Sequence, residues 1–218
     1  MKEQKIQLDI RRVRIANIDV QNTFMHWQGP FGPGTTAIIR VWETSIKPLV
    51  ERARGEGVEI AWMQAIYKEG EYMPFRLLAV QGDATVTIIN PVTGKEDSNW
   101  QISIWEGANL PGERVFQKSS PATFDWRGQD NGFNEWLGPK DKSQSVIITG
   151  FTASTCVDRA ICEVLDTGRT VIVPADSVGV RDKRLDDLPK FLEQWGRAGA
   201  IIIPTQGDIE FVNATRSR

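Results

Sequence analysis

The sequence contains few of the side chains that build disulfides and nucleophile–imidazole pairs. Only two cysteines and one histidine occur in its 218 residues. Cys156 and Cys162 stand six positions apart in a segment with helical patterning, where a rise of about 9 Å exceeds the reach of a disulfide. We therefore expect both to be free thiols. A Cys–His catalytic pair would have to use His26, and nothing in the sequence favours it.

Long apolar runs and blocks of one charge are also missing. No stretch reaches the roughly 18 consecutive apolar residues of a membrane span, and the charged start Met1–Lys5 does not resemble a signal peptide. Lys and Arg total 26 against 28 Asp and Glu, so no surface for nucleic acid or an anionic membrane is indicated. These absences predict a cytoplasmic protein whose partner is a small molecule, not nucleic acid and not a membrane.

The rest of the composition is that of an ordinary globular protein, and we expect one domain over residues 1–218. Short β-branched runs alternate with segments of helical periodicity, which is typical of a mostly parallel sheet with helices on both faces. The predicted fold is a three-layer α/β/α, Rossmann-like one. Strands are expected at 12–20, 58–66, 114–118, 145–150, 170–174 and 200–203, and helices at 36–53, 132–137, 154–167 and 185–196.

Two features interrupt this regular pattern. Pro48 is expected to kink or restart the first helix, because proline has no N–H and its ring clashes with the preceding turn. Residues 67–112 carry Pro74, Pro91 and Pro111 among scattered glycines and show no clear period. We expect loops and short strands there.

Three reactive side chains follow the carboxyl ends of predicted strands. Asp19 ends the first strand, Lys118 ends the strand 114–118, and Cys156 follows the strand 145–150. In open parallel sheets, ligands bind beyond these strand ends. The three residues are therefore predicted to meet at one rim of the sheet.

Cys156 has the position of a reactive thiol at the beginning of a helix. Its helix carries an apolar stripe, and both cysteines fall about 120° from the centre of that stripe, so neither is predicted to belong to the core. Only Cys156 lies in the first turn, where free N–H groups and the helix dipole favour thiolate. Cys162 is interpreted as a small space-filling hydrophobe.

Three segments, in order along the chain, resemble one enzyme family. They are Ile18-Asp-Val-Gln-Asn-Thr-Phe24, Leu110-Pro-Gly-Glu-Arg-Val-Phe-Gln-Lys118 and Ile148-Thr-Gly-Phe-Thr-Ala-Ser-Thr-Cys-Val-Asp-Arg-Ala160. Together they resemble the isochorismatase-like cysteine hydrolases, a group that includes nicotinamidases, N-carbamoylsarcosine amidases, biuret hydrolases and ureidoacrylate amidohydrolases. The likeness covers most of the chain apart from about residues 67–105.

The resemblance implies a catalytic triad of Asp19, Lys118 and Cys156. In that mechanism Asp19 takes the thiol proton, the sulfur attacks the substrate carbonyl, and water hydrolyses the resulting thioester. The family pattern puts the oxyanion hole at the backbone N–H groups of Thr152 and Cys156, with a cis peptide bond between Phe151 and Thr152.

The resemblance also bears on cofactors and on the reaction. Nicotinamidases carry a metal site built from an aspartate and histidines after the second strand, but Met63–Gly70 holds no histidine and no ligand cluster here. We therefore expect no catalytic metal and no other cofactor. Because true isochorismatases replace the cysteine, Cys156 argues against vinyl-ether cleavage.

Candidate substrate contacts come from the loops after the first strand and after the lysine strand. His26 could touch substrate or be a packing residue, and the tryptophans could line a pocket or pack in the core or at a subunit interface. The candidates are Gln21, Phe24, His26, Trp27, Phe124 and Trp126.

The sequence thus predicts a cysteine-dependent amidohydrolase that cleaves a non-peptide C–N bond of a small amide, carbamoyl or ureido substrate with water. The family resemblance implies a homo-oligomer, either a dimer or a tetramer. Two alternatives stay open: a thiol-based redox-reactive protein that uses Cys156, and a non-catalytic member of the same fold.

Overall fold

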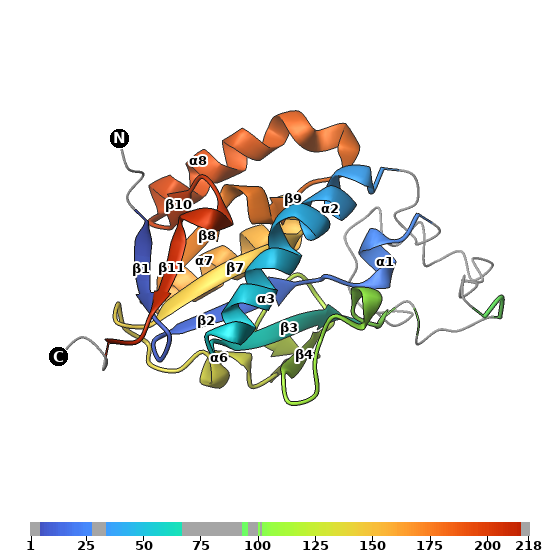
Figure 1. The fold of residues 1–218 in the computed structure, drawn as a ribbon. Helices are drawn as coiled ribbons and strands as arrows, with labels where there is room; N and C mark the ends of the chain where they lie inside the picture. The colour runs from blue at the N-terminus through green and yellow to red at the C-terminus, as the bar shows by residue number, and fades with distance from the viewer. Residues whose placement is uncertain (1–4, 28–33, 67–92, 96–99, 101, 215–218) are drawn as a thin grey trace.

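A seven-stranded parallel sheet forms the centre of the protein (Figure 1). The computed structural model describes residues 5–27, 34–66, 93–95, 100 and 102–214. The strand order is β10-β8-β7-β2-β3-β4, with β9 paired to the end of β7. The strands are β2 Val13–Ile18, β3 Glu59–Ala65, β4 Arg114–Lys118, β7 Ser145–Phe151, β8 Thr170–Pro174, β9 Val178–Gly179 and β10 Ile201–Ile203.

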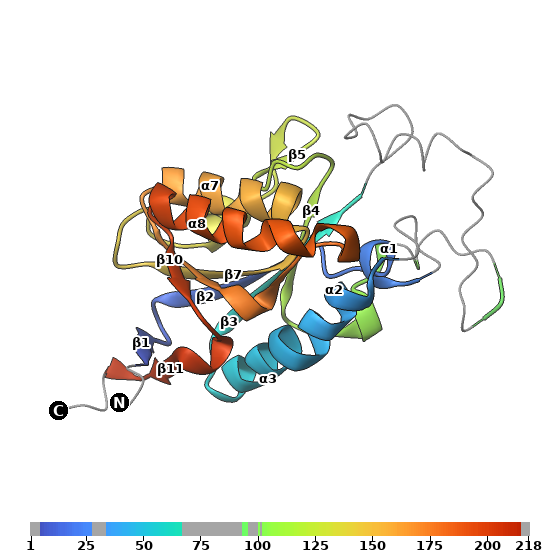
Figure 2. The same ribbon diagram turned by 90° about the horizontal axis from the view of Figure 1, so that it is seen from above.

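Helices cover both faces of this sheet (Figure 2). The continuous helix formed by α2 (Thr36–Val41), η1 (Trp42–Ile46) and α3 (Lys47–Gly55) lies on one side. The pair α7 (Asp158–Asp166) and α8 (Leu188–Ala198) lies on the other. The predicted three-layer α/β/α fold with a parallel sheet is confirmed.

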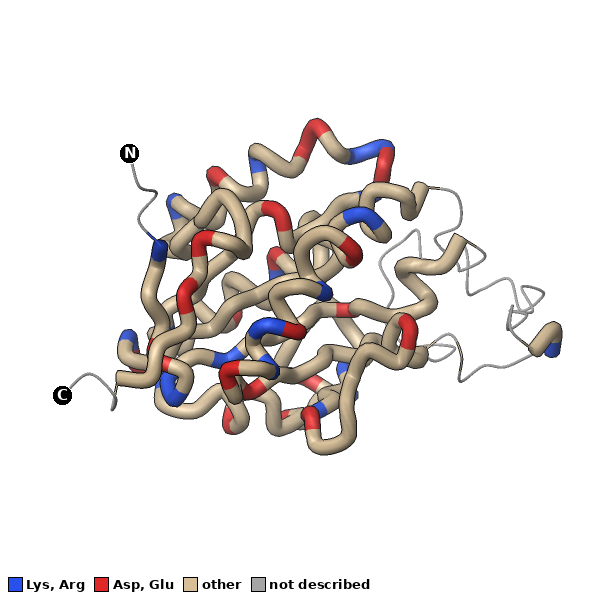
Figure 3. Tube along the Cα trace, viewed as in Figure 1, with Lys and Arg blue, Asp and Glu red and all other residues tan. Residues whose placement is uncertain are grey.

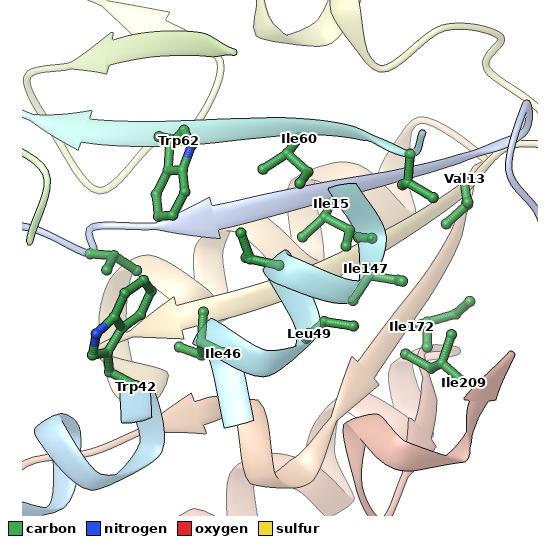
Figure 4. Close-up of a cluster of buried hydrophobic side chains, with 14 of the residues drawn as sticks. Val13, Ile15, Trp42, Ile46, Leu49, Ile60, Trp62, Ile147, Ile172 and Ile209 are labelled. Atoms are coloured by element: carbon green, nitrogen blue, oxygen red, sulfur yellow. The ribbon is translucent and has the colours of Figure 1, made fainter. Parts of the chain in front are cut away.

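Each face of the sheet has its own apolar core. Along β2, Val13 and Ile15 point towards the α2–α3 side and Ala16 and Ile18 towards the α7–α8 side. Because both faces are covered, the central strands are apolar at nearly every position. Figure 4 shows the first core, in which Trp42, Ile46 and Leu49 from the helix pack against Ile15, Ile60, Trp62 and Ile147.

The first helix passes Pro48 without a break. A π-helical turn over Trp42–Ile46 precedes the proline, and the Lys47 N–H donates to the carbonyl of Trp42 five residues back. Pro48 cannot donate to the carbonyl of Thr44, and the wider turn removes the ring clash that an α-helical turn would create. A π turn before Pro48 thus takes the place of the expected kink or restart.

Small elements complete the fold, and the helix predicted at 132–137 is among them as α6 (Phe133–Trp136). β1 (Ile6–Asp9) pairs in parallel with β11 (Ile209–Val212), so segments from the two ends of the chain lie side by side (Figure 1). Short helices are α1 Asn22–Met25, η2 Trp105–Gly107, α6 Phe133–Trp136, η4 Ala175–Ser177, η5 Asp182–Asp187 and η6 Gln206–Asp208, and a hairpin joins β5 Asp125–Trp126 to β6 Gln129–Asp130. Most of the range 67–112, predicted to be irregular, lies outside the described residues.

Charged residues of both signs are distributed over the whole fold (Figure 3), in keeping with a formal net charge of −2. None of the helices in the described part of the chain is long and apolar enough to cross a membrane.

Candidate active site

Asp19 and Lys118 form a completely buried ion pair at the carboxyl ends of their strands. Asp19 follows β2 with a left-handed φ of 53°, and its N–H donates to the Met63 carbonyl of β3 at 3.1 Å. Lys118 is the last residue of β4. Its Nζ lies 2.9 Å from Asp19 Oδ2, and both side chains are 0% exposed.

Cys156 joins this pair from the segment after β7. It lies in a π-helical turn, Ala153–Val157, that precedes α7, and it is buried in the core between the sheet and α7. The prediction that periodicity keeps Cys156 out of the core is wrong. A π turn contains more residues than an α turn, so the 100° spacing used for the prediction does not apply across it. Both cysteines are free, as expected, and Cys162 is half-buried.

The electrostatics of Asp19 and Cys156 are set mainly by burial. Burial raises the pKa of Asp19, although the Lys118 cation acts in the opposite direction. Burial and the negative charge of Asp19 raise the pKa of the Cys156 thiol to about 12, against a smaller lowering by Lys118. The thiol therefore keeps its proton at neutral pH in the free protein, because burial acts against the stabilisation of thiolate expected from the helix start.

The carboxylate of Asp19 is placed to take a proton. Neither of its oxygens accepts an aligned hydrogen bond within the described part of the chain, although Lys118 and the Cys156 thiol both interact with it. A buried carboxylate with a raised pKa is a stronger base than an exposed one.

The turn between β7 and Cys156 depends on a close approach of two strands. Gly150 has a φ of +114°, and a Cβ on it would lie 2.1 Å from the Ile18 carbonyl oxygen. Only glycine fits there. The predicted cis peptide bond between Phe151 and Thr152 is present. The carbonyl of Thr152 accepts the N–H groups of Thr155 at 3.0 Å and Val157 at 3.3 Å, which winds the turn that carries Cys156.

Gln21 and Phe24, two candidate substrate contacts, are buried. The side-chain nitrogen of Gln21 donates to the carbonyls of Ala65 at 3.1 Å and Ile102 at 3.0 Å, and its oxygen accepts the Ala65 N–H at 2.7 Å. Both amide hydrogens of Gln21 are therefore used by the main chain.

His26 belongs to a group of aromatic rings next to the loop after Asp19. Its ring centroid lies 4.8 Å from Trp100, 5.8 Å from Trp27 and 6.0 Å from Trp105. Burial lowers the pKa of His26 below its ordinary value near 6.5, so the imidazole is neutral at pH 7. Trp27 is 65% exposed. The backbone N–H of Trp105 donates to the backbone carbonyl of Val20, the neighbour of Asp19, at 3.0 Å.

Trp100 and Trp105 were not predicted from the sequence, because their stretch shows no period that would place it beside the first strand. The high tryptophan content of the chain was the available signal. We call His26, Trp27, Trp100 and Trp105 the rim aromatic group.

The loop after Lys118 is fastened to the helix that follows Cys156. The Thr123 N–H donates to the Glu163 carboxylate of α7 at 2.7 Å. Phe124 packs against the Phe133 ring with centroids 5.8 Å apart, whereas Trp126 stacks under the Arg127 guanidinium at 4.5 Å. Both aromatic candidates of this loop are half-buried, but their partners differ, since Phe124 packs against the core on the α7 side of the sheet and Trp126 lies against Arg127.

No group of three or more His, Cys, Asp or Glu residues in the described ranges could hold a metal ion. The end of the segment Met63–Gly70 lies outside those ranges. The absence of a catalytic metal stays a prediction.

The parallel sheet thus carries an aspartate, a lysine and a cysteine close together at its carboxyl rim. The sequence profile of the Isochorismatase domain matches residues 15–203, and the chain belongs to this family. The resemblance found in the sequence is thereby confirmed.

Solved structures with the same fold share little sequence with this chain. A cysteine hydrolase from Pseudomonas syringae pv. phaseolicola 1448A superposes with a TM-score of 0.69 at 13% identity, covering 95% of this chain and 96% of that one. N-carbamoylsarcosine amidase from Thermoplasma acidophilum superposes with a TM-score of 0.63 at 16% identity, covering 88% of this chain and 95% of that one. Pyrazinamidase of Pyrococcus horikoshii, solved in complex with zinc, superposes with a TM-score of 0.63 at 16% identity, covering 88% of this chain and 98% of that one. No curated protein sequence matches this chain significantly.

Proposed function

We propose that the protein is a cysteine-dependent amidohydrolase that cleaves a non-peptide C–N bond in a small amide, carbamoyl or ureido compound. The observation that carries this proposal is the buried Asp19–Lys118 ion pair, 2.9 Å long, whose two charges both act on the Cys156 thiol. A base, a cation and a nucleophile are thus held in one dry site, which is what covalent catalysis of acyl transfer requires.

The proposed first step forms a thioester. Asp19 removes the proton from Cys156, and the sulfur attacks the substrate carbonyl carbon to give a tetrahedral oxyanion. The oxyanion collapses by breaking the C–N bond, and Asp19 returns the same proton to the leaving nitrogen. Ammonia or an amine departs, and the acyl group stays on Cys156.

The second step regenerates the enzyme with water as co-substrate. Asp19 takes one proton from the water, the hydroxide oxygen attacks the thioester carbonyl, and the C–S bond breaks. The proton on Asp19 then returns to the departing sulfur, so the resting thiol and carboxylate are restored. Neither step requires a cofactor.

Lys118 supplies the charge that makes the proton transfer possible. The pKa of the thiol is raised to about 12 and that of Asp19 is also raised, so transfer is uphill in the free protein. The Lys118 cation stabilises both the thiolate that forms and the carboxylate that is consumed. We propose backbone N–H groups of Thr152 and Cys156 as the donors that stabilise the oxyanion.

The rim aromatic group is the proposed wall of the substrate pocket. It is tied to the chain beside Asp19 by the Trp105–Val20 hydrogen bond of 3.0 Å, and His26 within it is uncharged because burial lowers its pKa. Such a wall favours a substrate with an apolar or planar part attached to the amide carbonyl. The names of two similar structures, an N-carbamoylsarcosine amidase and a pyrazinamidase, support C–N cleavage.

The redox alternative is weaker. Peroxide-reactive cysteines are accessible and have a depressed pKa, whereas Cys156 is 5% exposed and its pKa is raised to about 12. The Asp19–Lys118 pair also has no role in a redox sensor. A non-catalytic member of the family would have no need to retain all three groups.

The test is release of ammonia or amine from a panel of carboxamides, carbamoyl amino acids and ureides. We expect the wild-type protein to hydrolyse at least one class, the Cys156→Ala variant to be inactive and the Cys162→Ala variant to retain activity. Absence of hydrolysis across the panel, or equal activity in the Cys156→Ala variant, would refute the proposal.

A further inference from the structure

Gln21 connects the loop that follows Asp19 to the end of the neighbouring strand. Its N–H donates to the Asp19 carbonyl at 2.9 Å, and its side chain is completely buried. The side-chain oxygen accepts the Ala65 N–H at 2.7 Å, and the side-chain nitrogen donates to the Ala65 carbonyl at 3.1 Å. The amide thus satisfies both main-chain groups of the last residue of β3, as a paired strand would.

Ala65 in turn borders the lysine of the ion pair. It is the register partner of Lys118, and the N–H of the following residue, Ile66, donates to the Lys118 carbonyl at 2.9 Å. Because β3 separates β2 from β4, the distance between Asp19 and Lys118 depends on where the end of β3 lies. A chain of direct contacts therefore runs from Asp19 through Gln21 and Ala65 to Lys118.

Asn22 provides a comparison on the same loop. Its side-chain nitrogen donates to the Trp100 carbonyl at 2.7 Å, and its N–H donates to the Ser103 carbonyl at 3.1 Å. Gln21 also contacts this segment, through the Ile102 carbonyl at 3.0 Å. The two neighbouring amides thus share one role, holding the segment with the aromatic residues, and differ in another, since Gln21 also binds the end of β3.

We propose that Gln21 is a positioning residue for the reaction: it fixes the end of β3 and thereby the place of Lys118 relative to Asp19 and Cys156. Asn22 holds only the segment that presents Trp100 and Trp105. This inference rests on the proposed function, and it reassigns Gln21 from substrate contact to support of the charged pair. Gln21 has no amide hydrogen left for a substrate.

The test compares Gln21→Met with Asn22→Ala, both in a Cys162→Ser background so that Cys156 is the only thiol. Methionine keeps the length of glutamine and removes all three side-chain hydrogen bonds. We expect Gln21→Met to lower kcat about 10- to 100-fold through misplacement of Lys118, with KM little changed. Asn22→Ala is expected to raise KM and to leave kcat near that of the parent. The proposal is overturned if Gln21→Met raises KM while Asn22→Ala lowers kcat, or if the two variants have equal effects.

A second measurement needs no substrate. The rate of alkylation of Cys156 by iodoacetamide is followed against pH in the same variants. Lys118 stabilises the thiolate, so displacing it in Gln21→Met shifts the profile to higher pH, whereas the Asn22→Ala profile stays with the parent. An alkylation profile of Gln21→Met that is unchanged, or shifted to lower pH, contradicts the inference. If no amide is hydrolysed but the shift occurs, the proposed function fails and the positioning role stands.

Folding is monitored by circular dichroism and thermal unfolding of each variant. Gln21→Asn serves as a second variant, because its neutral amide is one methylene too short to reach Ala65. We expect a shift of the alkylation profile in the same direction as for Gln21→Met. A folded Gln21→Asn protein with the parent's kcat and alkylation profile overturns the inference.

Discussion

The carboxylate of Asp19 and the ammonium of Lys118 lie 2.9 Å apart in a site where both are completely buried. Asp19 follows β2 and Lys118 ends β4, and β3 lies between these two strands in the sheet. Burying two charges costs several kcal/mol each and is seldom the most stable solution for a protein core. The pair is therefore better explained by its action on Cys156 than by a contribution to stability.

The cost of this pair can be measured. Lys118→Met leaves the Asp19 carboxylate buried and unpaired, and we expect the free energy of unfolding to fall by about 3 kcal/mol. The double variant Asp19→Asn, Lys118→Met carries no buried charge and should recover most of that loss, while both variants are inactive. Urea denaturation at pH 7 measures the difference. A double variant no more stable than Lys118→Met would contradict the interpretation.

The raised pKa of Asp19 sets the acid side of the pH profile. Protonation of Asp19 removes the base, so activity falls as the pH drops through the pKa of this group in the folded protein. We expect the midpoint of the acid limb in the pH profile of kcat/KM to lie above the ordinary aspartate pKa of 3.8. Initial rates across the acidic range measure the limb. A limb at or below the ordinary value would show that Asp19 is not the base.

Gly150 is predicted to be the least replaceable glycine near the site. Alanine there would place Cβ 2.1 Å from the Ile18 carbonyl oxygen in a residue with φ +114°, and we expect a loss of more than about 3 kcal/mol. Gly199 is the control, since its φ is +108° and nothing lies within 4 Å. Gly199→Ala should cost about 1 kcal/mol from the backbone conformation alone. Equal losses in chemical denaturation would rule out the steric explanation.

Glu113 is expected to stabilise the protein in a pH-dependent way. Burial alone would raise its pKa, but hydrogen bonds from Arg54, Trp62 and the Leu110 N–H outweigh burial and lower it below 4.5. Glu113 therefore contributes fully to the free energy of unfolding at a pH above its pKa in the unfolded chain. That contribution is lost as the pH falls through the lower pKa of Glu113 in the folded protein. We expect Glu113→Gln to cost about 2 kcal/mol at pH 7 and less near pH 3.

The control for this prediction is Glu193→Gln on α8. Glu193 pairs with Arg197 on the surface, where its side chain is 63% exposed, and the loss should stay below about 1 kcal/mol at either pH. Urea unfolding of both variants at the two pH values makes the comparison. A Glu113→Gln loss that does not shrink in acid would contradict the assigned role.

The strands of the main sheet were readable from the sequence because their signal is local. Arg114–Lys118 and Thr170–Pro174 coincide with the predicted ranges, since short β-branched runs bounded by turn residues define buried strands. By contrast, β1 pairs with β11 about 200 residues further along the chain. Nothing local in Ile6–Asp9 indicates a partner that far away.

The positions of the site residues were likewise predictable, but their environment was not. Strand ends brought Asp19, Lys118 and Cys156 to one rim, because parallel strands share that edge. The burial of Cys156 was missed since it depends on a π turn that has no known sequence period. Trp100 and Trp105 were missed because tertiary hydrogen bonds, not periodicity, hold them beside the first strand.

The most direct test of the central claim is mass spectrometry of the protein quenched in acid during turnover of an amide that it hydrolyses. We expect a mass increase equal to the acyl group on the peptide that contains Cys156. The adduct should be absent from the Cys156→Ala variant and present in the Cys162→Ala variant. Steady turnover by the Cys156→Ala variant, or an acyl group found on another residue, would contradict the account.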